Sequence, residues 1–139
     1  MKVRRKARAA ALQTLYELAC TRHPLEDVLS ERIVQAGLGE DSATFARELV
    51  KGVIDSARTL DREIARHAPE FPLDQMAVID RAILRIALWE IGVGRITPLK
   101  VAINEAVELA KDYGSDSAPR FINGVLGSVA QAFVGSEAP

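Results

Sequence analysis

Residues 73–91 read LDQMAVIDRAILRIALWEI and form the most apolar segment of the chain. Apolar side chains fall on almost every face of the helix that it predicts: Met76, Val78, Ile79, Ile83, Leu84, Ile86, Ala87, Leu88, Trp89 and Ile91. A helix that is apolar all round is buried by its neighbours. The sequence therefore predicts a central helix, ended by Gly92 and Gly94, with other helices packed around it.

The segments on either side predict those other helices. Apolar residues recur with the spacing of one helix face over residues 3–20, 25–34, 41–67, 98–114 and 119–133. Residues 68–72, APEFP, contain two prolines and predict a turn. No segment alternates with the period of a strand, and no linker suggests a second domain. We expect an all-α fold of six or seven helices in a single domain over residues 1–139.

Three helix ends carry specific signals. Asp41 or Ser42 is a plausible N-cap for a long third helix that reaches about His67. Thr97 and Pro98 fit the N-cap and first position of the helix that follows the centre. Gly114 suits the position just after the end of that helix.

Basic residues are concentrated at the N-terminus. The first eight residues contain five of them: Lys2, Arg4, Arg5, Lys6 and Arg8. The other 13 basic residues and all 19 acidic residues lie from residue 17 onward, so this part of the chain has a net charge of −6. Positive charge at the start of a helix opposes the helix dipole, which favours a functional role over a merely solvated first turn. If these residues neutralise the phosphates of a nucleic acid, the affinity of the chain for that nucleic acid falls as the salt concentration rises.

The sequence offers little for catalysis. Cys20 is the only cysteine, which excludes a disulfide framework and a thiolate metal cluster, and we expect it to be buried. His23 and His67 are isolated beside prolines and are expected to be solvated or capping. Glu105 and Glu108 are expected to be solvated or paired with Lys111. With no phosphate-binding loop or nucleophile elbow, we expect no enzyme, no cofactor and no metal site.

The composition also indicates where the chain acts. No apolar run approaches the length of a membrane span, and the segment after the basic cluster is amphipathic, unlike a secretory signal. We expect a cytoplasmic protein with no membrane partner.

Charged residues interrupt the central helix. Arg81 and Arg85 lie one turn apart, and Arg85 is expected to pair with Glu90, Glu105 or another acid across a helix interface. Asp80 points away from Arg81. An exposed acid on an otherwise buried helix suggests a docking contact.

Residues 120–124, RFING, form a second candidate contact. Arg120 is a cation near the predicted helix start, and Phe121 departs from the apolar row of Ile122 and Val125. A core position for Phe121 stays open. An exposed one beside an arginine would stack on an unpaired base.

These segments resemble the NusB family of bacterial transcription antitermination factors. The resemblance covers residues 4–8, RRKAR, with 11–16, ALQTLY, and residues 80–87, DRAILRIA. It continues through residues 98–111, PLKVAINEAVELAK, and 121–126, FINGVL. The matching strings span nearly the whole chain in the family's order.

The resemblance implies a compact NusB-like fold of two packed helical bundles. It implies binding to boxA-type RNA together with NusE, a ribosomal small-subunit protein, within the RNA polymerase antitermination complex. The basic cluster, with Arg120 and Phe121, matches the family's RNA contacts, and Tyr16 and Asp80 match positions at its NusE interface. A homodimer stays open.

Besides a helical enzyme, two other functions stay open. One is a stand-alone relative of the NusB-like domain of ribosomal RNA cytosine methyltransferases. The other is a helical protein–protein adaptor whose basic end meets an acidic partner.

Overall fold

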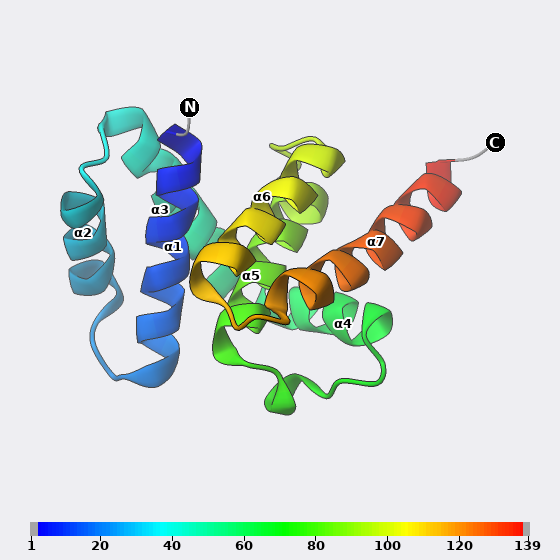
Figure 1. The fold of residues 1–139 in the computed structure, drawn as a ribbon. Coiled ribbons are helices and arrows are strands. Elements are labelled where there is room, and N and C mark those ends of the chain that lie inside the picture. Colours follow the sequence, from blue (N-terminus) through cyan, green and yellow to red (C-terminus); the bar gives the residue numbers. More distant parts are fainter. Residues whose placement is uncertain (1–2, 138–139) are drawn as a thin grey trace. The chain divides into compact units, whose positions relative to one another are not determined.

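The computed structural model describes residues 3–137, with side chains described as far as residue 133. Seven α-helices and no strands occur in that range, which confirms the predicted all-α class. The chain divides into two compact units between Asp55 and Ser56. Figure 1 shows the helices of each unit in sequence colours.

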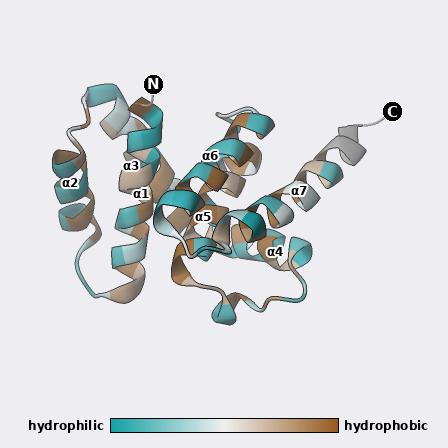
Figure 2. Ribbon diagram, in the orientation of Figure 1, coloured by the Kyte–Doolittle hydropathy of each residue, from teal (hydrophilic) through white to brown (hydrophobic). Residues whose placement is uncertain are grey.

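The first unit contains three helices, α1 (Val3–Cys20), α2 (Leu25–Ala36) and α3 (Glu40–Asp55). Helix α1 packs against both α2 and α3. Leu12, Leu29 and Leu49, one from each helix, are fully buried in its core. The left-handed Gly37, with φ of 66°, ends α2 because its N–H reaches the carbonyls of Ile33 and Val34. The amphipathic α2 alternates between brown and teal segments in Figure 2.

The second unit is built around α5 (Val78–Leu88). Helices α4 (Ala57–His67), α6 (Leu99–Tyr113) and α7 (Ala118–Glu137) all pack against it, as Figure 1 shows. A short 3-10 helix, η1 (Leu73–Gln75), precedes it, and a π-helical segment, η2 (Trp89–Val93), follows it directly. Ile83 and Leu84 are fully buried, which confirms the prediction of a central helix.

The structure corrects the predicted long helix over residues 41–67. The helix is interrupted at Ser56, so α3 and α4 are separate helices. Helix α3 begins at Glu40, one residue before the predicted start. No proline or glycine marks the break. The N–H of Leu60 still donates to the carbonyl of Ser56 at 2.9 Å, so few backbone hydrogen bonds are lost by turning there.

The central stretch is also divided. Met76 and Ala77 are extended, with ψ of 146° and 140°, and α5 therefore begins at Val78 instead of Leu73. Arg81 donates to the carbonyl of Leu73 at 3.0 Å and holds η1 against α5. Gly94 lies so close to the Trp89 ring that a Cβ there would be 2.8 Å from it, so only glycine fits without a shift.

Two helix-end predictions change in detail. Pro98 is the N-cap of α6, because the Thr97 hydroxyl donates to the buried carboxylate of Glu90 instead of capping the helix. Gly114 follows α6 as predicted, in an extended conformation with φ of −94°. A Cβ on Gly114 would lie 2.5 Å from that of Ala118, so glycine is needed there for close packing.

An ion pair joins α4 to α5. Arg85 donates from Nε and a terminal nitrogen to the two carboxylate oxygens of Asp61, at 2.7 and 2.9 Å. The predicted pairing of Arg85 with an acid on another helix is therefore confirmed, and the acid is Asp61.

Candidate nucleic-acid interface

The basic end of α1 is organised around one aromatic ring. The guanidinium carbon of Arg4 lies 4.2 Å from the centroid of the Phe45 ring, and that of Arg8 lies 5.2 Å from it. Phe45 belongs to α3 and is almost fully buried. The negative face of the ring attracts both cations and offsets part of their mutual repulsion.

The five predicted cations differ in exposure. Arg4 and Lys6 are exposed, Arg5 is half-buried, and Arg8 is buried at 4% exposure. Arg8 is thus a packed side chain instead of a free cation on the surface. Lys2 lies outside the described residues. The first turn of α1 contains no acidic residue.

The second predicted contact lies at the start of α7. Arg120 is exposed and Phe121 is half-buried. Phe121 meets Phe71 edge to face, with ring centroids 5.0 Å apart and an interplanar angle of 70°. Phe71 lies in the turn after α4 and is 53% exposed, so the pair has an open face.

Two cavities flank the aromatic pair. One, of about 240 Å³, is lined by His67, Glu70, Phe71, Arg120, Phe121 and Val125, among others. The other, of about 340 Å³, is lined by Phe71, Gln75, Met76, Ala77, Asp80, Ser117, Arg120 and Phe121. Both have mainly apolar walls, as sites for flat organic ligands do.

Asp80 is not the exposed acid that the sequence suggested. It is partly buried, and its Oδ1 has no hydrogen-bond partner among the described residues. Burial raises the pKa of its carboxyl, because removal from water disfavours the charged form. The only cation among the residues that line its cavity is Arg120 of α7, while Arg81 on its own helix is engaged with Leu73.

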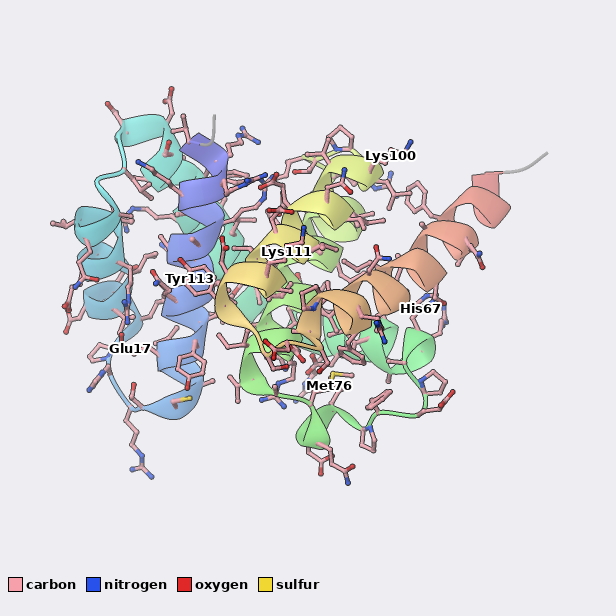
Figure 3. The ribbon with its side chains drawn as sticks, in the orientation of Figure 1. Glu17, His67, Met76, Lys100, Lys111 and Tyr113 are labelled. Atoms are coloured by element: carbon pink, nitrogen blue, oxygen red, sulfur yellow. The ribbon has the colours of Figure 1, made fainter. Side chains whose placement is uncertain are left out.

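His67 forms the wall of the smaller cavity. Its Nδ1 is hydrogen-bonded to Ser128 Oγ of α7 at 2.9 Å, and its side chain is 9% exposed. The labelled side chain in Figure 3 therefore joins α4 to α7. The expectation of a solvated or capping histidine is wrong here, since the imidazole bridges two helices.

Tyr16 is the exposed candidate for a protein contact. Its side chain is 43% exposed on α1, next to a cluster of charged residues. Glu17 Oε2 lies 2.7 Å from His23 Nδ1, and its Oε1 lies 3.0 Å from Arg32. Hydrogen bonds from His23 and Arg32 lower the pKa of Glu17. Cys20, one turn further on, is exposed, which corrects the expectation of a buried thiol.

Other chemistry is sparse in the described part of the chain. No group of three or more potential metal ligands comes together within residues 3–137. Glu108 pairs with Lys111 at 3.0 Å, as predicted. No helix among the described residues is both long and apolar enough to cross a membrane.

Residues 5–131 match the model of the NusB family. The chain belongs to the NusB family. The transcription antitermination protein NusB of Roseiflexus castenholzii is 48% identical over 133 residues, which cover 94% of each chain. The protein of the same name from Chloroflexus aggregans is 45% identical, over 94% of this chain and 89% of that one.

Solved structures of NusB proteins have the same fold. NusB of T. maritima superposes with a TM-score of 0.83 at 29% identity, over 92% of this chain and 90% of that one. A structure of the antitermination factors NusB and NusE in complex with double-stranded RNA gives a TM-score of 0.85. Its identity is 23%, and the match covers 95% of this chain and 98% of that one. These likenesses confirm the predicted NusB fold.

Sequence reasoning does not identify Phe71, which lines both cavities of this candidate site. In the sequence it is only part of a turn between two prolines. A large aromatic residue in a turn, outside any apolar helix row, was the available signal. Its partner Phe121 is 50 positions away, so only the fold could show that the two rings meet.

Proposed function

We propose that this NusB-family chain is a transcription antitermination factor that binds boxA-type RNA together with NusE and joins the RNA polymerase antitermination complex. The relatives that are 45 and 48% identical are named transcription antitermination proteins. A protein of the same fold has been solved with NusE and double-stranded RNA. The proposal takes residues 1–139 as one RNA-binding domain.

The basic end of α1 carries this proposal. Five cations precede any acid in the sequence, and the first turn of α1 contains no carboxylate. Positive charge at the N-terminus of a helix is unfavourable with respect to the helix dipole, and a phosphate backbone would neutralise it. Arg4, Arg5 and Lys6 are the residues that would contact phosphates, and Lys2 continues the cluster. Arg8, packed on Phe45, would position this end of the helix.

Arg120 and Phe121 supply the second RNA contact. The open face of the Phe71–Phe121 pair would stack on an unpaired base, while the exposed Arg120 would meet its phosphate. Tyr16, exposed on α1, would contact NusE. The role is binding without catalysis, without a cofactor, in the cytoplasm and with no membrane contact.

Charge reversal of an exposed lysine tests the proposal. Lys6→Glu is compared with Arg22→Glu, which makes the same change in charge at an exposed position beyond the other end of α1. Binding to a labelled boxA-type RNA is followed by fluorescence anisotropy over a range of salt concentrations. Lys6→Glu should bind more weakly, with a salt slope smaller by about 0.7 for each lost phosphate contact.

The control separates a local contact from general attraction. Arg22→Glu should keep nearly the affinity and slope of the parent chain. Equal weakening by both substitutions, or by neither, would contradict an RNA contact at the start of α1.

A further inference from the structure

Helix α4 carries a stripe of arginines on its outer face. Arg58, Arg62 and Arg66 follow one another at intervals of four residues, and all three are exposed. Residues four apart lie next to each other on the same side of a helix. The stripe therefore runs along the exposed side of α4. Leu60 and Ile64, on the other side, are buried in the core of the second unit.

Two of the three arginines are not balanced by a carboxylate. Arg66 pairs with Glu63 at 3.6 Å. Arg58 and Arg62 form no ion pair among the described residues. Asp61, the acid next to Arg62 in the sequence, already accepts two hydrogen bonds from α5. Arg58 lies in the first turn of α4, which contains no acidic residue and where a cation is unfavourable with respect to the helix dipole.

The composition of this face favours phosphates over a protein surface as its partner. Its other exposed members are Thr59 and Ala65, and no large apolar side chain is exposed on α4. Protein interfaces owe most of their affinity to buried aromatic and apolar anchors, which this face lacks. A guanidinium group, by contrast, donates two parallel hydrogen bonds to a phosphate and stays charged at neutral pH.

The spacing of the stripe suits an extended strand. The rise of an α-helix places the backbone of Arg58 about 12 Å from that of Arg66 along the helix axis, with Arg62 midway between them. Successive arginines are therefore separated by about the distance between neighbouring phosphates of an extended single strand. Three consecutive phosphates of one strand would each meet one guanidinium.

The stripe ends beside the second RNA contact proposed above. Arg66 is followed by His67, which lines the smaller cavity together with Arg120. The His67 side chain also joins α4 to α7, and the two helices pack against each other in Figure 1. RNA that leaves this cavity along α4 would reach Arg66 first and Arg58 last.

We propose that the arginine stripe of α4, formed by Arg58, Arg62 and Arg66, binds phosphates of the RNA that flanks the boxA-type element on one side. The inference rests on the proposed RNA binding and adds a surface outside the basic cluster of α1 and the start of α7. Because every nucleotide carries the same phosphate, the stripe adds affinity without sequence preference. Its contribution falls as salt rises, since each phosphate contact releases counterions.

The test compares a boxA-type RNA with the same RNA extended by eight uridines at its 5′ end or at its 3′ end. Affinities are measured by fluorescence anisotropy over a range of salt concentrations. The stripe variant combines Arg58→Gln with Arg62→Gln. The control variant combines Arg22→Gln with Lys100→Gln, which removes the same charge from exposed positions outside α4. Glutamine is a good helix former, and circular dichroism checks that each variant is folded.

One of the two extended RNAs should bind the parent chain about five- to tenfold more tightly than the unextended RNA at low salt. Its salt slope should be steeper by about 0.7 for each phosphate engaged. The stripe variant should bind the unextended RNA like the parent chain and lose most of this gain, while the control variant keeps it. Arg58→Lys combined with Arg62→Lys, which preserves the charge, should keep most of the gain.

The other outcomes separate the inference from the proposed function. If neither extension strengthened binding to the parent chain, the RNA path along α4 would be overturned, and an acidic protein segment would be the remaining partner for the stripe. A gain that survives in the stripe variant, or that is lost equally in the control variant, would also overturn the inference while leaving RNA binding intact. If the parent chain bound neither the unextended nor the extended RNAs, the proposed function would fall and the inference with it.

Discussion

Arg4 lies over the face of Phe45, with its guanidinium carbon 4.2 Å from the ring centroid. Arg8 lies over the same ring at 5.2 Å, so one buried phenylalanine holds two cations of α1. Phe45 therefore serves both the core of the first unit and the placement of its positive charge.

Replacing Phe45 by leucine tests this double role. Phe45→Leu retains an apolar core side chain but removes the negative ring face. We expect RNA affinity to fall about two- to fivefold, as loss of a cation–π contact of about 0.5–1 kcal/mol predicts. Leu49→Met, a volume-conserving change on the same helix, should leave RNA affinity unchanged. The RNA affinity of both variants is measured by fluorescence anisotropy. If Phe45→Leu bound RNA as tightly as the parent chain, the ring would have no part in RNA binding.

The Arg85–Asp61 pair should contribute more to stability than the surface pairs. Asp61→Asn breaks a bidentate contact in which both side chains are more than two-thirds buried. We expect a loss of about 1–3 kcal/mol in the free energy of unfolding, measured with urea. Glu108→Gln, which breaks the exposed pair with Lys111, should cost about 0.5 kcal/mol or less. An equal loss of unfolding free energy in the two variants would mean that the Arg85–Asp61 pair stabilises the chain no more than an exposed pair does.

Two glycines should respond to alanine with opposite signs. Gly114→Ala places a Cβ 2.5 Å from that of Ala118, so we expect a loss of about 1–3 kcal/mol. Gly127 lies inside α7 with nothing within 4 Å of an added Cβ. Gly127→Ala should therefore stabilise the chain by about 0.5–1 kcal/mol through better helix propensity. Thermal unfolding of both variants checks the pair, and a gain in Gly114→Ala would contradict the close packing.

Asp80 should make stability depend on pH in a defined direction. Burial raises the pKa of its carboxyl in the folded chain, so the folded state binds the proton more tightly than the unfolded state. This contribution favours folding below the ordinary aspartate pKa of about 3.9 and is lost as pH rises through the folded-state pKa. Asp80→Asn removes the titration. Its stability should thus rise relative to the parent chain as pH increases, in urea unfolding across a pH series.

The sign of the change in stability tests the burial of the Asp80 carboxylate. If Asp80→Asn lost stability relative to the parent chain with rising pH, the carboxylate would be stabilised in the folded state by a donor.

Local patterns predicted most of the helices, because apolar spacing and glycine positions are properties of neighbouring residues. Helix α1 begins and ends where its apolar rows do, and the all-round apolar pattern of residues 78–88 correctly indicated burial of α5. The break at Ser56 left no such signal. Val53 and Leu60 are both buried and are two helical turns apart, so the apolar row continues across a break that tertiary packing imposes.

The candidate site depended more on contacts between distant residues. The sequence could identify the charge of Arg4 and Arg8, but their ring is 37 residues or more away in α3. The exposure of Asp80 was misjudged for a similar reason. Its surroundings come from the turn before α5 and from the start of α7, which only the folded second unit brings together.

The proposed antitermination role is tested by measuring how this chain binds boxA-type RNA in the presence and absence of NusE. The purified chain is titrated against the boxA-type RNA and against a scrambled RNA of the same composition, at one fixed salt concentration. We expect tighter binding of the boxA-type RNA than of the scrambled RNA, and still tighter binding when NusE is present. Equal affinity for the two RNAs with NusE present, or no binding to either, would contradict it.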